Sequence, residues 1–323
     1  MATLVTHHFL FTTRVVRPLE LDEHSGSALR GNLFEAVWQR FCNNKAALSC
    51  AACPLNQMCP VSALVAPLRE ENVRGRDIPR PYVILPPLEG ERRFAPGETM
   101  SFGLTLFGTI IELLPYLLLV TNSLEATGLG RRLPENQGRR GTFKIQQIEA
   151  YNPIDGTRQV LSEAGKLRIE APAVAVTSMD VRKRAANLSA KQITIHFLTP
   201  TRLQHEDRLV YRPEFQPLVA RLLERLALLE QEYGQGDEPS PSQQWQELAP
   251  LASHIECTDN QTRWEEVRSY SKRSHYMTQI GGISGSATFA GNLAPFLELL
   301  VWGELVHVGK NVVKGSGWYR IEH

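Results

Sequence analysis

Residues 274–322 read "SHYMTQIGGISGSATFAGNLAPFLELLVWGELVHVGKNVVKGSGWYRIE". The glycines and alternating apolar residues up to Gly291 are typical of a β-hairpin. The apolar run over 292–305 predicts a buried helix. A Gly-rich, basic loop follows, and 318–322 predicts a last strand. Hairpin, helix, loop and strand, in this order, form the second part of the ferredoxin-like βαββαβ arrangement.

The segments before this stretch complete the arrangement and repeat it. The elements predicted in the second half are a strand over 192–203 and an amphipathic helix over 215–233. Those of the first half are a strand over 4–16, a helix that begins near Ser27, a strand pair, a helix over 109–127 and a strand over 142–152. We therefore predict an α+β protein with tandem ferredoxin-like (RRM-like) domains, at 1–180 and 181–323.

The chain shows no pattern of a membrane or secreted protein. Its start lacks a basic segment followed by an apolar one, so no signal peptide is predicted. The stretch 102–120 is nearly long enough to span a bilayer, but it contains Glu112 and Pro115. We expect a strand and a buried helix there, a cytoplasmic protein, and no membrane partner.

Basic residues form local clusters although the formal net charge is only +1. Such clusters on a nearly neutral chain favour an anionic ligand, although solvated surfaces also carry runs of this kind. The clusters are Arg131, Arg132, Arg139, Arg140 and Lys144; Arg182, Lys183, Arg184 and Lys191; and Lys310, Lys314 and Arg320.

Four of the five cysteines lie within one short segment. Cys42, Cys50, Cys53 and Cys59 have the spacing C-x7-C-x2-C-x5-C, and the C-x2-C pair lets two thiolates hold one metal. A structural zinc site is predicted, as a knot at 42–59 inserted in the first domain. An iron–sulfur cluster uses the same ligands, and free buried thiols are the alternative without a metal.

The terminal stretch, taken as a whole, resembles the CRISPR-associated endoribonucleases that process precursor crRNA, which belong to the RAMP superfamily. The upstream "ALRGNLFEAVWQRFC" and the cysteines after it resemble a cysteine-bearing branch of that family. The matching residues are Gly281–Gly282, Phe289 with Gly291, Gly303–Glu304, His307 with Gly309 and Lys310, Gly315, Gly317 and Tyr319, and Leu129–Arg132 upstream.

The resemblance implies cleavage of CRISPR repeat RNA without a catalytic metal. A 2′-hydroxyl attacks the adjacent phosphate and leaves a 2′,3′-cyclic phosphate and a 5′-hydroxyl. Family members commonly carry a catalytic histidine in or just before the first helix, and His24 occupies that place here. Histidine suits proton transfer because its pKa lies near neutrality. His24 is therefore the predicted general acid or base.

Several residues are candidates for RNA binding. Arg30 is predicted at the scissile phosphate, and His307 is predicted to shape the terminal loop. The remaining candidates for phosphate contacts are Arg131, Arg132, Arg139, Arg140, Lys310, Lys314 and Ser316.

Other functions fit parts of the same sequence. A non-catalytic subunit that holds crRNA in an effector complex would use the same loops, and effector subunits are therefore possible partners. A zinc-stabilised assembly protein would dock through the cysteine knot and would not bind RNA. A redox protein with a cluster in the knot would absorb visible light.

Overall fold

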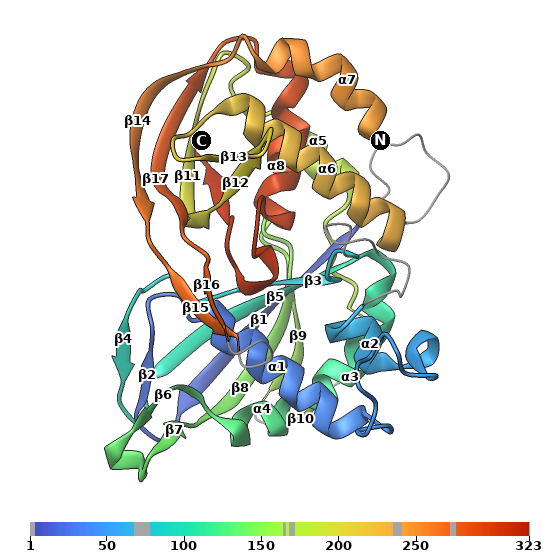
Figure 1. Cartoon of the computed structure of the whole chain (residues 1–323), viewed down its shortest axis with the longest axis vertical. Helices are drawn as coiled ribbons and strands as arrows, with labels where there is room; N and C mark the ends of the chain where they lie inside the picture. Colours follow the sequence, from blue (N-terminus) through green and yellow to red (C-terminus); the bar gives the residue numbers. More distant parts are fainter. Residues whose placement is uncertain are drawn as a thin grey trace. The chain divides into compact units, whose positions relative to one another are not determined.

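The structure is a computed structural model that describes residues 4–67, 78–163, 166–167, 172–234, 241–271 and 276–322. The chain divides into two compact units (Figure 1). The N-terminal unit is Val5–Ala175 with Glu232–Gly234, and the C-terminal unit is Val176–Gln231 with Gln235–His323 and the first residues, Met1–Leu4. The change of unit at Ala175 lies five residues before the boundary proposed at 180, because helix α5 (Ser178–Ala185) packs on helix α8 (Leu297–Val306).

The N-terminal unit is built on one antiparallel sheet. Its central strands come in the order fourth, first, third and second of a βαββαβ chain, which is the ferredoxin-like order. Two further strands extend the sheet beyond the fourth. Across the sheet the strands are β10 (Lys166–Leu167), β9 (Arg158–Glu163), β8 (Phe143–Tyr151), β1 (Thr6–Val15), β5 (Thr99–Phe107) and β3 (Tyr82–Leu85).

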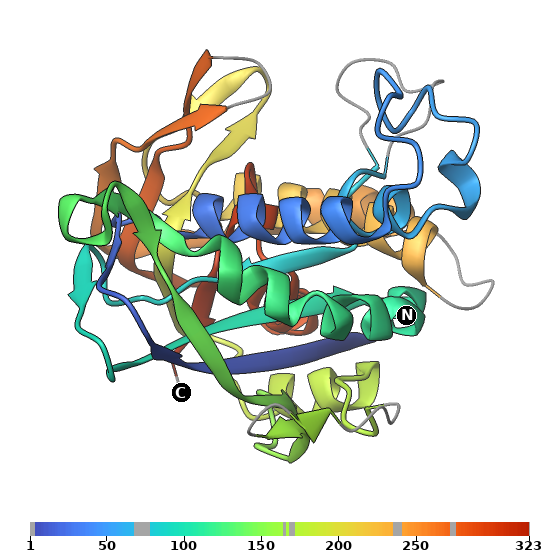
Figure 2. The same cartoon turned by 90° about the horizontal axis from the view of Figure 1, so that it is seen from below.

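Helices cover one face of this sheet (Figure 2). They are α1 (Gly26–Phe41), α3 (Leu114–Leu119) and α4 (Thr121–Thr127), with α2 (Pro60–Val65) packed on α1. The single helix predicted over 109–127 is wrong. A 3₁₀ helix (Gly108–Leu113) precedes α3, and α3 has Pro115 in its first turn, where the missing N–H of proline is tolerated.

The C-terminal unit repeats the same strand order in a four-stranded antiparallel sheet. The strands are β14 (Glu256–Glu265), β17 (Gly282–Ala290), β11 (Gln192–Thr201) and β18 (Tyr319–Ile321), again second, third, first and fourth. Helices α6 (Phe215–Tyr233) and α8 lie on one side of this sheet (Figure 1), and α7 (Pro241–Ala252) leads into β14. The α+β fold with two ferredoxin-like units is confirmed.

The hairpin predicted within 274–291 is wrong. Strand β17 pairs with β14 and β11, while β16 (Tyr276–Gln279) pairs with β15 (Arg268–Ser271) in a separate ribbon. An added Cβ at Gly281 would lie 2.2 Å from the carbonyl oxygen of Glu265, so glycine is required between β16 and β17. Residues 272–275, where the predicted hairpin begins, lie outside the described residues.

Small two-stranded ribbons occupy the connections of both units. They pair β2 (Leu19–Leu21) with β4 (Arg92–Phe94), β6 (Leu129–Leu133) with β7 (Arg139–Gly141), and β12 (Leu203–His205) with β13 (Arg208–Val210). Short 3₁₀ turns complete the fold at Asn56–Met58, Pro134–Asn136, Ala294–Phe296 and Val312–Lys314.

Within the described residues, no single helix is long and apolar enough to cross a membrane. One helix pair that is bent by 55°, Gly108–Leu119 with Thr121–Thr127, meets the test of length and composition. Leu114, Leu117 and Leu118 of this pair are buried in the N-terminal unit.

Two histidines on β1 are buried in the N-terminal unit. His8 is 2% exposed, and its two ring nitrogens hydrogen-bond the hydroxyls of Thr6 and Thr105, both at 2.9 Å. Burial lowers the pKa of His8 to about 3 and that of His7 to about 4. Both imidazoles are therefore neutral in the folded protein at neutral pH.

Candidate functional site

Two connections come together in the N-terminal unit. One joins β1 to α1, and the other is the β6–β7 ribbon before the fourth strand. Gly130, at φ +79°, packs so tightly that an added Cβ would lie 2.0 Å from the carbonyl oxygen of Glu20. The Asn136 side chain donates a hydrogen bond of 2.7 Å to the carbonyl of Pro18. The arginine-bearing ribbon is thus fastened to the segment that leads to His24.

The same two connections come together in the C-terminal unit. Here they are the segment after β11 and the terminal Gly-rich loop. Gly309, at φ +89°, leaves no room for a Cβ, which would lie 2.4 Å from the carbonyl oxygen of Arg202. That same carbonyl accepts a 3.0 Å hydrogen bond from the backbone N–H of Lys310. These glycines therefore allow two segments of the protein backbone to approach each other.

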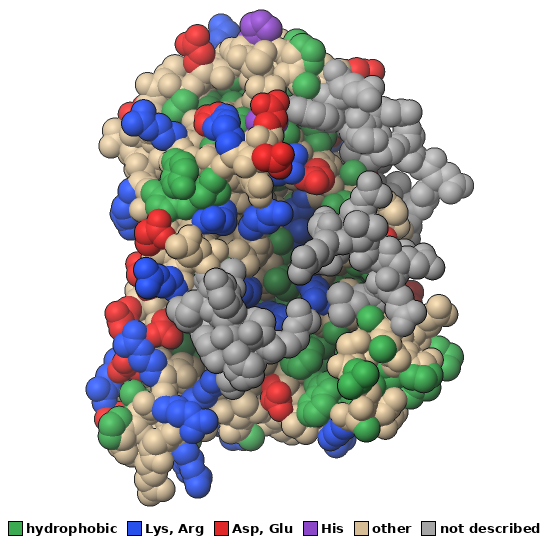
Figure 3. Space-filling view, viewed as in Figure 1, with side chains coloured by type: hydrophobic (Ala, Val, Ile, Leu, Met, Phe, Trp, Pro, Cys, Tyr) green, Lys and Arg blue, Asp and Glu red, His purple; other side chains and the backbone are tan. Residues whose placement is uncertain are grey.

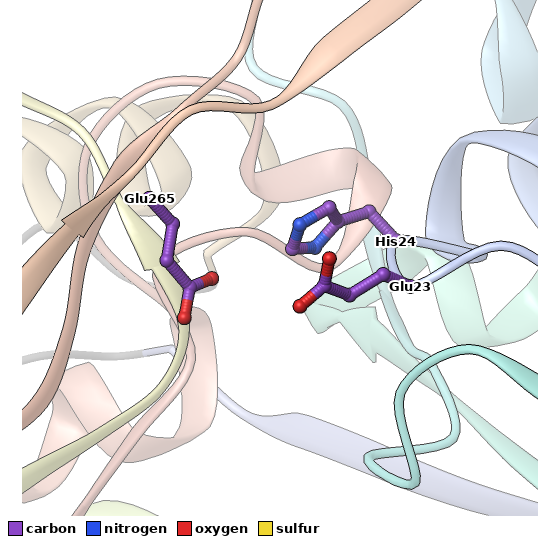
Figure 4. Close-up of side chains that lie close together, drawn as sticks. All are labelled: Glu23, His24 and Glu265. Carbon is purple, nitrogen blue, oxygen red and sulfur yellow. The ribbon is translucent and has the colours of Figure 1, made fainter.

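His24 lies in the turn just before α1 and is partly exposed. Ser25 follows it, and the Ser25 carbonyl accepts the backbone N–H groups of Ala28 and Leu29, both at 3.0 Å. The exposed Glu23 places a carboxylate oxygen within 4.8 Å of an imidazole nitrogen of His24 (Figure 4). The sequence pattern did not single out Glu23, and its position directly before His24 is the signal that could have done so.

Arg30 is directed toward the interior of the N-terminal unit. Its guanidinium lies 5.7 Å from the centre of the Phe34 ring. Burial raises the pKa of the Tyr82 hydroxyl, and the charge of Arg30 opposes this shift. Arg30 is half-buried on α1, where its guanidinium lies near the Phe34 ring and the Tyr82 hydroxyl.

The arginines of the β6–β7 ribbon are not equivalent. Arg131 pairs with Glu20 at 3.0 Å, with Asp22 at 2.5 Å and with Glu91 at 2.7 Å. The hydrogen bond to Asp22 and the other acidic neighbours raise the pKa of the Arg131 guanidinium above its ordinary value. These carboxylates compete with any phosphate for Arg131. Arg132 donates to the carbonyl of Gly138 at 3.3 Å, and Arg139 is exposed and Arg140 half-buried in β7.

Basic side chains are visible on the surface over β6 and β7 (Figure 3). Acidic side chains lie among the neighbouring blue ones, in agreement with the ion pairs of Arg131. Arg132 and Arg139 therefore remain the better candidates for phosphate contacts in this ribbon.

The site residues predicted in and beside the terminal loop differ in exposure. Lys310 is exposed and Lys314 is half-buried. His307 is fully buried, and its ring stacks on Trp318 with the two planes 5° apart. Ser316 is only 7% exposed. The phosphate contact predicted for Ser316 does not fit its burial, whereas the predicted role of His307 in shaping the loop agrees with its full burial.

Three of the family-matching residues near the end of the chain, Gly303, Glu304 and Tyr319, pack the last helix against the last strand. An added Cβ at Gly303 would lie 2.0 Å from the hydroxyl oxygen of Tyr319, and that hydroxyl donates to the Leu300 carbonyl at 2.6 Å. The Glu304 carboxylate accepts the backbone N–H of Ile321 at 2.8 Å. These contacts join α8 to β18, so they fix the two ends of the Gly-rich loop.

The four clustered cysteines lie at the C-terminus of α1 and before α2. Cys42 ends α1, Cys59 begins α2, and Cys53 accepts a 3.7 Å hydrogen bond from Asn44. Burial raises the pKa of the Cys50 thiol, and the other three thiols raise it further. Among the described residues, however, no cysteine sulfur belongs to a set of three metal-type ligand atoms within 4.8 Å of one another. The structure does not show the four described cysteines drawn together as a knot, and the metal site stays a prediction.

An exposed aromatic group of the C-terminal unit was missed by the sequence reasoning. Tyr211, which follows β13, contacts Trp264 of β14. The two residues are 53 positions apart, and no local pattern links them. The one available signal was an exposed aromatic residue in the turn "VYRPEF" before a predicted helix.

Two family models match the chain. One is described as an N-terminal domain (AF_1859_N) and covers residues 4–174, more than half of the chain. The other is the CRISPR-associated endoribonuclease Cas6, which covers residues 195–319. No curated protein sequence matches the chain.

Solved structures share the fold. A Cas6 (TTHB231) product complex has a TM-score of 0.57 and 14% identity, over 98% of this chain and 99% of that one. Thermus thermophilus Cas6 (TTHB231) has a TM-score of 0.53 and 14% identity, over the full length of both chains. A partial Cas6-RT-Cas1–Cas2 complex has a TM-score of 0.61 and 15% identity, over 100% of this chain and 46% of that one. The chain therefore belongs to the family of that N-terminal domain, and over residues 195–319 it is Cas6-like.

Proposed function

We propose that this protein is an endoribonuclease that cuts CRISPR repeat RNA in precursor transcripts, without a catalytic metal, to make guide RNAs. The 2′-oxygen forms a bond to the adjacent phosphorus, and the bond from phosphorus to the 5′-oxygen breaks. The products are a 2′,3′-cyclic phosphate and a 5′-hydroxyl. The family match over 195–319 and the fold support the substrate class.

The observation that carries the proposal is the position of His24. It is a partly exposed imidazole directly before the first helix, beside the carboxylate of Glu23. The reaction needs one group that takes the 2′-hydroxyl proton and one that gives a proton to the leaving 5′-oxygen. Histidine can do either task near neutral pH. We assign one of these two transfers to His24.

The remaining requirement is positive charge for the phosphate. Arg132 and Arg139 of the β6–β7 ribbon and Lys310 of the terminal loop have exposed side chains. Lysine and arginine neutralise phosphates and release counterions, so binding should weaken steeply as the salt concentration rises. Repeat RNA is the proposed partner of all three.

A cleavage assay in EDTA tests the proposal. Labelled repeat RNA is compared with the same RNA that carries a single 2′-deoxy at each candidate position. We expect one cut that survives EDTA and disappears with one 2′-deoxy substitution, together with a cyclic phosphate end. A cut that needs added Mg²⁺ would contradict the mechanism. Tight binding without a cut would instead indicate a subunit that holds crRNA in an effector complex.

We also propose that Cys42, Cys50, Cys53 and Cys59 hold a structural zinc ion. The support is the spacing of the thiols and their mutual effect on the pKa of Cys50. A metal here would join the C-terminus of α1 to the start of α2. Purified protein should contain about one zinc per chain by elemental analysis, and Cys53→Ser should lower both the zinc content and the melting temperature. Iron with visible absorbance would indicate a cluster, and Cys257→Ser, which changes the cysteine on β14, is the control.

A further inference from the structure

In the C-terminal unit, the exposed ring of Tyr211 packs on a second aromatic side chain, Trp264. Tyr211 is 59% exposed, which is unusual for a large aromatic side chain. Its ring centre lies 4.6 Å from that of Trp264, with the ring planes 51° apart. The Arg202 guanidinium lies 5.6 Å from the Trp264 ring centre. Trp264 therefore supports Tyr211 and is itself packed against a cation.

Hydrogen bonds hold this group in place. Arg208 and Glu214 lie on either side of Tyr211 in the sequence and make a double hydrogen bond, of which one distance is 2.8 Å. Arg202 donates to the carbonyl of Gly281 at 3.1 Å. The ring of Tyr211 is thus presented by a fastened loop, and binding to it would cost little additional ordering.

The polar groups at and beside Trp264 already have hydrogen-bond or ion-pair partners. The indole N–H of Trp264 donates to the Glu266 carboxylate at 2.8 Å. Glu265 pairs with Arg263 at 2.8 Å. These carboxylates disfavour a free phosphate at this place, whereas the exposed ring of Tyr211 can still stack with a flat, uncharged partner. A nucleobase has this chemistry.

The aromatic group is connected to the terminal loop. Arg202 packs its side chain on Trp264, and its carbonyl accepts the backbone N–H of Lys310. In the space-filling view, an apolar patch flanked by Lys and Arg side chains lies over the strands of this unit (Figure 3). The Arg202 carbonyl thus links the support of Tyr211 to the loop that carries the exposed Lys310, and this lysine can bind the backbone of the same RNA strand.

We propose that Tyr211, supported by Trp264 and Arg202, forms a stacking site for one unpaired base of the RNA substrate. This inference rests on the proposed function and adds a subsite to it. The chemical class of the ligand is a single-stranded stretch of RNA beside the repeat hairpin, since a paired base is already stacked in its helix. Base stacking on an aromatic side chain tolerates any base, so the site contributes affinity and position more than sequence specificity.

Affinity measurements with the full-length protein test this site. The RNA is a repeat hairpin with unpaired flanks, blocked against cleavage by 2′-deoxy at the cut site, beside the same RNA with an abasic residue at each unpaired position in turn. We expect Tyr211→Ala to weaken binding by about ten- to a hundredfold. Tyr211→Phe keeps the ring and should bind normally. Tyr116→Ala removes a partly exposed ring that packs on Phe41 in the N-terminal unit, and it should not change the affinity.

The abasic series locates the base. One abasic position should weaken the wild-type complex by the same factor as Tyr211→Ala, and the two changes together should cost no more than either alone. Equal affinities of wild type and Tyr211→Ala for the blocked RNA, with the unmodified RNA still cut, would overturn the stacking site and leave the proposed function intact. A protein partner would then be the class of ligand that remains. If the wild-type protein does not bind the RNA at all, the proposed function and the stacking site fail together.

Discussion

The two units use the same strand order, yet the same place in the fold carries different chemistry in each. The connection from the first strand to the first helix holds His24 in the N-terminal unit and Tyr211 in the C-terminal unit. In both units this connection is fastened by a glycine of the loop before the fourth strand, Gly130 or Gly309. The comparison teaches that both units keep the contact between two connections, while the side chain presented there differs, an imidazole in one unit and a phenol ring in the other.

The largest expected effect is on the cleavage rate, which a change at His24 should lower and a change at Tyr211 should not. His24→Ala should lower the single-turnover cleavage rate by about 10²–10⁴-fold, the usual contribution of a general acid or base, while RNA affinity stays unchanged. Tyr211→Ala should instead change affinity. His254→Ala, which alters an exposed histidine after α7, is the matched control for His24. If His24→Ala cuts at the normal rate, the assignment of proton transfer to this residue is wrong.

The glycine contacts can be broken in each unit separately. Gly130→Ala and Gly309→Ala place a Cβ against a backbone oxygen at positive φ, and each should lower the free energy of unfolding of its own unit by about 2–5 kcal/mol. Gly138→Ala has a similar φ of +72° but meets no atom within 4 Å, so it should lose only about 1–2 kcal/mol. Calorimetry of the three variants measures this difference, and equal losses would show that crowding does not matter.

The buried histidines make the N-terminal unit more sensitive to acid. The folded-state pKa values of His7 and His8, about 4 and about 3, lie below the unfolded value near 6.5. The unfolded chain therefore binds more protons below pH 6.5, and stability falls as the pH is lowered toward 4. Each histidine contributes up to about 1.4 kcal/mol per pH unit in this window.

The C-terminal unit should respond less, because its shifted carboxyl groups oppose one another. Burial raises the pKa of Glu304, whereas the hydrogen bond from Arg208 lowers that of Glu214. Calorimetric scans between pH 4 and pH 7 measure the two transitions. His7→Gln should flatten the pH dependence of the N-terminal transition, and an unchanged slope would mean that protonation of this buried imidazole does not cause the loss of stability in acid.

The smallest expected effect compares the basic loops of the two units. Lys310→Ala should weaken RNA binding several-fold and reduce the steepness of the salt dependence by about 1. Arg131→Ala should change the affinity by less than about twofold, because surface ion pairs with three carboxylates already occupy this guanidinium. Binding titrations over a range of salt concentrations distinguish the two variants. An equal loss in both would mean that RNA displaces the acids around Arg131.

Much of the fold follows from local patterns. The helix predicted over 215–233 is α6, with the same bounds, because apolar residues recur at helical spacing along one face. The strand predicted over 142–152 is β8, where apolar and polar residues alternate. Strand β14 was missed because most of its residues are exposed, so it has no alternating pattern and becomes a strand through its pairing with β17.

The sequence by itself determined the tandem ferredoxin-like order, because periodicity and turn residues are local features, whereas His24 was predicted from the resemblance to the endoribonuclease family. Only the tertiary structure decided that His307 is buried, that the acids around Arg131 neutralise it, and that Tyr211 meets Trp264. Burial, charge pairing and ring contacts each depend on residues that are distant in the chain, and the packing of two connections against each other brings them together.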